Sequence, residues 1–91
     1  MGSISAVDLE LWPSGLARLA DGILEVTTGE PIRVPVSDII EIGWKPPRAG
    51  RLSLTLRYRA GLDTVSGSWW VESRNEAALH ALIEAVEASR A

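Results

Sequence analysis

The chain has 91 residues, of which 46% are hydrophobic and 23% charged, so it is sized for one domain with a thin core and lacks the composition of disordered proteins. Its formal charge of −3 argues against general binding to nucleic acid or anionic lipid, because both attract positive charge. It contains no cysteine, which excludes a disulfide framework and a thiolate metal site.

The N-terminal residues carry no strand or helix pattern. Met1-Gly2-Ser3 resembles a cloning remnant. The N-terminal segment lacks the basic start and apolar centre of a signal peptide. No segment approaches the roughly 20 apolar residues that span a bilayer. We therefore expect a flexible N-terminus over 1–6, in part a cloning remnant, and a single domain over 7–91. This domain is expected to be cytoplasmic, either alone or as a soluble part of a larger or membrane-associated protein.

The first part of the chain predicts short strands, because apolar and polar residues alternate with period two between turn-forming residues. Asp21-Gly22 suits the positive φ angles of a type I′ hairpin turn. Pro35 cannot donate to a ladder, so its segment is predicted to be an edge strand or a strand end. The predicted strands are 7–12, 16–20, 23–28 and 32–36.

The middle of the chain predicts a strand, an exposed loop and a second strand. In the segment 39–44, Ile40, Ile42 and Trp44 share one face, which predicts that Trp44 packs in the core. The segment Lys45-Pro46-Pro47-Arg48-Ala49-Gly50 is basic and too rich in proline for regular structure, so we expect a contact loop or a plain connector. Alternation over 51–59 is the clearest strand signal in the chain.

The strand 51–59 is expected to form an antiparallel hairpin with 64–71. We expect Arg51 opposite Trp70 if the loop has two residues and Ser53 opposite Trp70 if it has four; both registers keep the same faces. Trp69 then points to the core and Trp70 to the outside. Trp70 is either an interface residue or is covered by neighbours such as Arg51, and both interpretations remain open.

The last segment predicts an amphipathic helix of about four turns. Ser73-Arg74-Asn75-Glu76 has capping-box spacing, so Ser73 is expected to cap the amide of Glu76. The apolar stripe that follows consists of Leu79, Leu82, Ile83 and Val86. His80 lies off this stripe between Glu76 and Glu84, where a surface ion pair is the natural interpretation. A histidine-based triad could use only this imidazole, the carboxylates are spread along the chain, and no glycine-rich phosphate-binding loop is present, so we expect no enzyme activity and no catalytic residues.

These elements predict an α+β, mainly β fold: a small barrel of two near-orthogonal antiparallel sheets with about seven strands, capped by the C-terminal amphipathic helix. Two runs carry a resemblance to bacterial pleckstrin-homology-like (PH-like) domains. They are Ile32-Arg33-Val34-Pro35-Val36-Ser37-Asp38-Ile39-Ile40-Glu41-Ile42 and Gly50-Arg51-Leu52-Ser53-Leu54-Thr55-Leu56. The resemblance covers nearly the whole chain and implies a PH-like barrel of four plus three strands closed by the C-terminal helix, with a non-catalytic binding or scaffolding role. Independently of the resemblance, no cluster of residues has metal-ligand spacing and no glycine-rich phosphate-binding loop is present, so we expect no cofactor and no metal.

The same resemblance makes a prediction about lipids. PH-like domains that bind phosphoinositides place basic side chains around the loop between their first two strands. Here that loop, 12–15, has no Lys or Arg, and Arg18 and Arg33 are the nearest basic residues. This departure from the pattern disfavours inositol-lipid binding.

The candidate functional residues lie on the outer face of the predicted hairpin and in the loop before it. The interaction face consists of Trp70, Arg51, Arg57 and Arg59, and the contact loop of Lys45 and Arg48. Trp and Arg are enriched at interface hot spots, so we expect a protein partner or a homo-oligomer, bound through this face or through an open sheet edge. The alternative is a lipid headgroup or small anion. The loop and Arg59 lie at opposite ends of a strand of about 30 Å, which one compact anion site cannot easily bridge.

Overall fold

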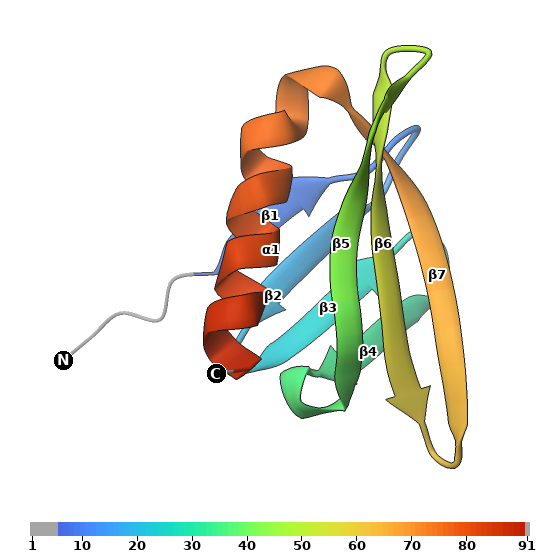
Figure 1. Cartoon of the computed structure of the whole chain (residues 1–91), viewed down its shortest axis with the longest axis vertical. Helices are drawn as coiled ribbons and strands as arrows, with labels where there is room; N and C mark the ends of the chain where they lie inside the picture. The colour runs from blue at the N-terminus through green and yellow to red at the C-terminus, as the bar shows by residue number, and fades with distance from the viewer. Residues whose placement is uncertain (1–5, 91) are drawn as a thin grey trace, which may run out of the picture.

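A computed structural model describes residues 6–90, and these residues form two antiparallel sheets and one C-terminal α-helix (Figure 1). The first sheet has the order β1-β2-β3-β4, with β1 Val7–Glu10, β2 Leu16–Ala20, β3 Ile23–Thr27 and β4 Pro31–Pro35. The second has the order β5-β6-β7, with β5 Ile39–Arg48, β6 Arg51–Ala60 and β7 Asp63–Glu72. The short 3-10 turns η1 Val36–Asp38 and η2 Ser73–Asn75 precede β5 and the helix α1 Glu76–Arg90.

The prediction of a mainly β fold with a C-terminal helix is confirmed for the described part of the chain. The prediction for the N-terminus falls on residues 1–6, of which only Ala6 is among the described residues. No helix within residues 6–90 is long and apolar enough to span a membrane.

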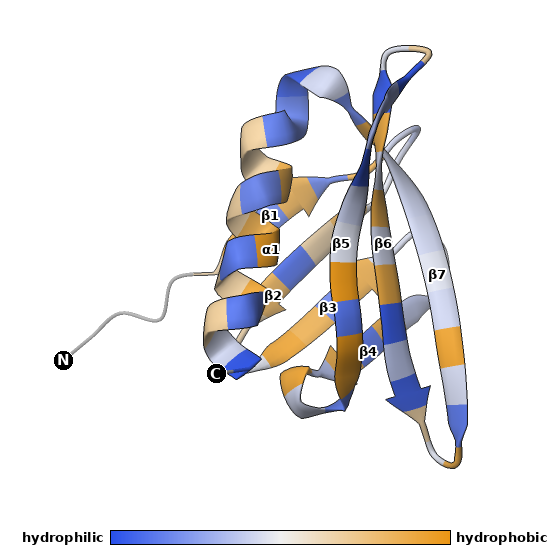
Figure 2. Ribbon diagram, viewed as in Figure 1, coloured by the Kyte–Doolittle hydropathy of each residue, from blue (hydrophilic) through white to orange (hydrophobic). Residues whose placement is uncertain are grey.

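The core lies between the two sheets and under the helix. Alternating residues of each strand face it, as Figure 2 shows by the orange bands that interrupt the strands. Helix α1 contacts β1, β2 and β5, and three residues of its predicted stripe, Leu79, Leu82 and Val86, are fully buried. The largest fully buried side chains in the strands are Leu9, Leu24, Val26, Val34, Leu52, Leu54 and Val71.

Trp12 connects the two sheets. It follows β1, and its backbone N–H donates a hydrogen bond of 2.8 Å to the carbonyl of Trp70 in β7. The turn after Trp12 begins with a cis peptide bond to Pro13 and is closed by the hydrogen bond from the Leu11 N–H to the Gly15 carbonyl. One corner of the domain is therefore joined by a backbone contact between sheets.

The prediction that 45–50 is a loop is wrong for its first four residues. Strand β5 continues through Pro46 and Pro47 to Arg48, and only Ala49 and Gly50 form the turn, both with positive φ. The pairing shifts between Lys45 and Arg48, where the strand bulges. Two prolines are tolerated here because β5 is an edge strand with a ladder on one side only, and a bulge leaves residues unpaired.

The predicted capping box at the start of the helix is also wrong. The N–H of Glu76 donates to the backbone carbonyl of Ser73 within a 3-10 turn. The Ser73 hydroxyl instead donates to the carbonyl of Gly50 at 2.7 Å, and the carboxylate of Glu76 lies 3.2 Å from His80. Ser73 therefore ties the helix entrance to the β5–β6 turn.

Candidate functional site

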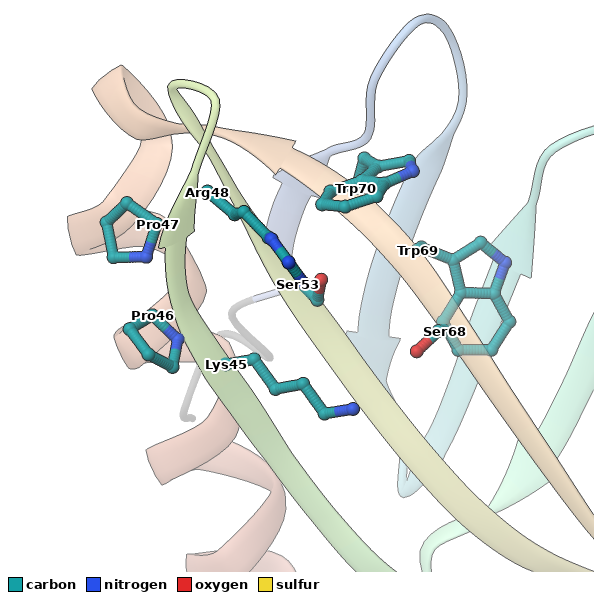
Figure 3. Close-up of a pocket in the computed structure, with 8 residues that line it drawn as sticks. All are labelled: Lys45, Pro46, Pro47, Arg48, Ser53, Ser68, Trp69 and Trp70. Carbon is teal, nitrogen blue, oxygen red and sulfur yellow. The ribbon is translucent and has the colours of Figure 1, made fainter.

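The outer face of the β5–β6–β7 sheet, which is the side turned away from the core, holds an open hollow of about 650 Å³. Figure 3 shows Lys45 and Arg48 from β5, Ser53 from β6 and Trp70 from β7 around it. We call it the Trp70 hollow. Its full lining is Lys45, Pro46, Pro47, Arg48, Ser53, Ser68, Trp69 and Trp70.

The register of the β6–β7 hairpin places these residues together. Ala60 pairs with Asp63 across a two-residue turn, and Ser53 is opposite Trp70. The sequence prediction assigned Arg51 to this position for a two-residue loop, which is wrong because continuing the ladder from the Ala60–Asp63 pair leads to Ser53. The predicted faces are nevertheless correct for Trp70, which is 44% exposed. A small side chain opposite the indole leaves the space that the hollow occupies.

Arg51 does not cover Trp70; it stacks on Trp12. Its guanidinium carbon lies 3.5 Å from the centroid of the Trp12 ring, which is the geometry of a cation–π contact. Both residues are half-buried. The sequence alone placed Arg51 in the interaction face. The contact links β6 to the segment that follows β1.

Trp69, the neighbour of Trp70, is directed to the other side of the sheet and is half-buried (Figure 3). Its ring lies against Gly67, where a Cβ atom would be only 2.7 Å from Cη2 of the indole. A residue without a side chain is therefore required at 67 for Trp69 to keep this position. The two adjacent tryptophans serve different sides of the same strand.

The basic residues predicted for the site separate into two groups. Lys45 and Arg48 line the Trp70 hollow. Arg57 lies 3.6 Å from Glu41 and borders a second hollow of about 430 Å³, which also includes Lys45 and Ser68. Arg59 pairs with Thr64 next to the far turn and lines neither hollow.

The outer face is positively charged among the described residues. It carries the five basic side chains Lys45, Arg48, Arg51, Arg57 and Arg59 and the two acidic ones Glu41 and Glu72. The whole chain has nine basic and twelve acidic residues, which leaves four basic and ten acidic residues elsewhere. A net charge of −3 for the chain therefore conceals a basic face. Composition could not reveal this basic face, because the strand register determines which charged side chains share one side of the sheet.

Trp44 differs from the prediction that it packs in the core. It is 41% exposed, with its ring at the border between β5 and α1. Its centroid lies 4.7 Å from that of His80 in an edge-to-face contact. His80 also lies 3.2 Å from Glu76, which confirms the predicted ion-pair arrangement on the helix surface. Trp44 shares its face with core residues, but the helix covers it only in part.

The two arginines nearest the first loop are each beside a carboxylate. Arg18 donates two hydrogen bonds to Asp8, of 2.7 and 3.0 Å, and these bonds lower the pKa of Asp8 below its ordinary value and raise that of Arg18. Arg33 lies 3.6 Å from Glu25. Within the described residues, no three His, Cys, Asp or Glu side chains gather where they would hold a metal ion.

Comparison with known proteins gives no relative to argue from: no protein-family model matches the chain, and no curated protein matches it.

Proposed function

We propose that this chain is a non-catalytic PH-like binding module that docks a partner protein on the outer face of β5, β6 and β7. The observation that carries the proposal is the Trp70 hollow, in which an indole that is 44% exposed lies beside Lys45 and Arg48. Trp and Arg contribute most often to interface hot spots, and an exposed indole is costly to leave in water without a use. The basic charge of the face favours an acidic partner.

The PH-like assignment is part of this proposal. Sheets of four and three strands followed by a C-terminal helix match the element order that the resemblance implies. The contact between Trp12 and Trp70 joins one corner of the two sheets, and helix α1 lies along β1 and β5. These contacts support a partly open, near-orthogonal barrel whose remaining gap is covered by the helix.

The proposal is tested with two variants, each of which has one tryptophan replaced. Each variant is expressed in cells and used to capture the partner, and the purified complex is then cross-linked. Trp70→Ala should abolish capture of the partner. Trp44→Ala should leave capture unchanged, because Trp44 is similarly exposed, at 41%, but lies beside the helix. Light scattering of each variant shows whether the partner is a second copy. Equal binding by both variants would refute docking at the Trp70 hollow.

A second candidate function is binding of a lipid headgroup or small anion. It is favoured by one observation, that Lys45 and Arg48 line the same hollow as the hydroxyl residues Ser53 and Ser68. Arg59 lines neither hollow, so this candidate site does not include it. Co-sedimentation with phosphatidylserine vesicles at low salt tests the lipid form of this function, and failure to sediment would exclude binding to an anionic lipid surface.

A further inference from the structure

Strand β7 has an edge without a partner strand over residues 64–68, in the part of the chain that the structure describes. The carbonyl of Trp70 accepts a hydrogen bond from Trp12, so it points away from β6. Because this direction alternates along an antiparallel strand, the N–H and C=O groups of Thr64, Ser66 and Ser68 also point away from β6. All three residues are exposed. A row of donors and acceptors therefore faces solvent.

The edge of β4 and the two ends of the β5 edge are blocked by proline or by a side chain. The N–H of Val36 donates to Gly22 in the direction of β3, so the alternation directs Pro31, Arg33 and Pro35 of β4 outward. Two of these three lack an N–H. Strand β5 ends in Pro46-Pro47, and Arg90 donates to its Ile40 carbonyl at 3.0 Å. Such residues protect edges from unwanted pairing.

Strand β7 has no such protection between residues 64 and 68, where the outward backbone groups belong to two serines and a threonine. The Trp12–Trp70 contact covers the edge only at its C-terminal end. The contrast with β4 and β5 indicates that this edge is kept available for pairing.

The two sides of the free edge differ in chemistry. On the inner side, Val65 is 36% exposed, and the indole of Trp69 lies over Gly67, which is the next residue of β7 on that side. On the outer side, Ser66 and Ser68 border the hollow that also contains Lys45 and Arg57. A strand added here would place alternate side chains against an apolar and a basic surface.

We propose that β7 binds an extended segment of a partner protein by antiparallel strand addition, and that acidic residues alternate with apolar residues in this segment. The acidic side chains lie on the basic outer face, and the apolar ones cover Val65 and Trp69. A second copy of this chain is the poorer occupant, because pairing of two β7 edges would place two net positive faces side by side. This inference rests on the proposed function and adds the conformation and chemistry of the partner.

The test uses the synthetic peptide N-acetyl-Ser-Glu-Val-Glu-Val-Glu-Val-Ser-amide and the ¹⁵N-labelled protein. Binding should slow amide hydrogen exchange at Thr64, Ser66 and Ser68 and leave Arg33, which faces outward on β4, unchanged. Residues opposite one another in an antiparallel pair have their side chains on the same face, so the glutamates should lie opposite Thr64, Ser66 and Ser68. Because the backbone groups of these three residues point toward the peptide, the glutamate N–H groups should donate to β7. N-methylation of the glutamates should weaken binding by at least roughly tenfold, whereas N-methylation of the valines should not.

Two protein variants provide the matching experiment. Ser66→Pro removes an N–H that makes no bond to β6, and should abolish peptide binding. Ser66→Ala removes the same hydroxyl but keeps the N–H, and should bind as the wild type does. A peptide with lysine in place of every glutamate should bind at least roughly tenfold more weakly, because the outer face is basic.

Equal binding by the two methylated peptides, or no protection of the three β7 amides at saturating peptide, would overturn strand addition. A peptide that fails to bind at all would overturn it too. If the peptide still depends on Trp70 but not on the N–H of Ser66, the docking face is correct and the strand-addition inference is wrong. The methylated peptides keep this distinction even if Ser66→Pro does not fold.

Discussion

The guanidinium of Arg51 in β6 lies over the ring of Trp12, which follows β1, with 3.5 Å between the guanidinium carbon and the ring centroid. The two sheets therefore meet through a side-chain stack as well as through the backbone bond from Trp12 to Trp70. Trp12 therefore contacts β6 through its ring and β7 through its backbone, at the same corner of the domain.

Arg51→Ala should lower the free energy of unfolding by about 0.5–1 kcal/mol, since it removes a cation–π contact at a half-buried site. The matched control is Arg57→Ala on the same face of the same strand, whose exposed pair with Glu41 at 3.6 Å should contribute little. Urea unfolding followed by far-UV circular dichroism measures both variants without depending on tryptophan emission. Equal losses in the two would contradict a stabilising stack.

Gly67→Ala should destabilise the domain by about 1–3 kcal/mol, because the new Cβ would lie 2.7 Å from Cη2 of Trp69 and the ring would have to leave its position. Tryptophan emission should shift to longer wavelength as the indole becomes wetter. Gly43→Ala on the neighbouring strand β5 is the control, because its nearest atom, Oγ1 of Thr55, is 3.5 Å away. A silent Gly67→Ala would show that Trp69 is not held there.

Ser73→Asp separates the structure from the capping-box interpretation. Aspartate is a good N-cap, so a capping role for Ser73 predicts no loss of stability. In the structure the hydroxyl donates to the Gly50 carbonyl at 2.7 Å, and an ionised carboxylate cannot donate. We therefore expect Ser73→Asp to lower the free energy of unfolding by about 1 kcal/mol or more at neutral pH, and we expect the same of Ser73→Ala. Chemical denaturation at one pH measures all three proteins.

The Asp8–Arg18 pair predicts a loss of stability in acid. Hydrogen bonds from Arg18 lower the pKa of Asp8 in the folded state below its ordinary value of 3.8. As pH falls, Asp8 is protonated in the unfolded chain at a higher pH than in the folded protein. The pair's contribution to the free energy of unfolding is therefore complete above the ordinary pKa and is lost as pH falls through the lowered pKa of the folded state. Carboxyl NMR should show a lower pKa for Asp8 in the wild type than in Arg18→Gln. Coincident titrations would refute the pairing.

Much of this fold could be predicted because alternation and helical spacing record burial directly. Leu52 and Leu54, which alternate with polar residues in the segment 51–59, are fully buried, and so is Leu82 of the predicted apolar stripe of the helix. The opposite directions of Trp69 and Trp70 follow from the same period of two.

The errors arise where tertiary contacts override local preference. Pro46 and Pro47 read as a loop, yet an edge strand with a bulge accepts them. Ser73 has the spacing of a cap, yet its hydroxyl donates to the Gly50 carbonyl, and the Glu76 N–H donates to the Ser73 carbonyl instead of the hydroxyl.

The candidate site was predicted in its residues but not in its geometry. Trp70, Lys45 and Arg48 were named from the sequence, but the pairing of Ser53 with Trp70 and the stacking of Arg51 on Trp12 depend on register and on contact between sheets. These follow from how distant segments meet, which a single sequence does not state.

The separation of charge on this domain also has a kinetic consequence. A face with five basic and two acidic side chains, on a molecule whose net charge is −3, gives the domain a large electric dipole. An acidic molecule approaching in solution is repelled by most of the surface and turned toward one side before contact. Its association rate should therefore fall steeply with ionic strength, because the orienting field fades beyond about 8 Å in physiological salt.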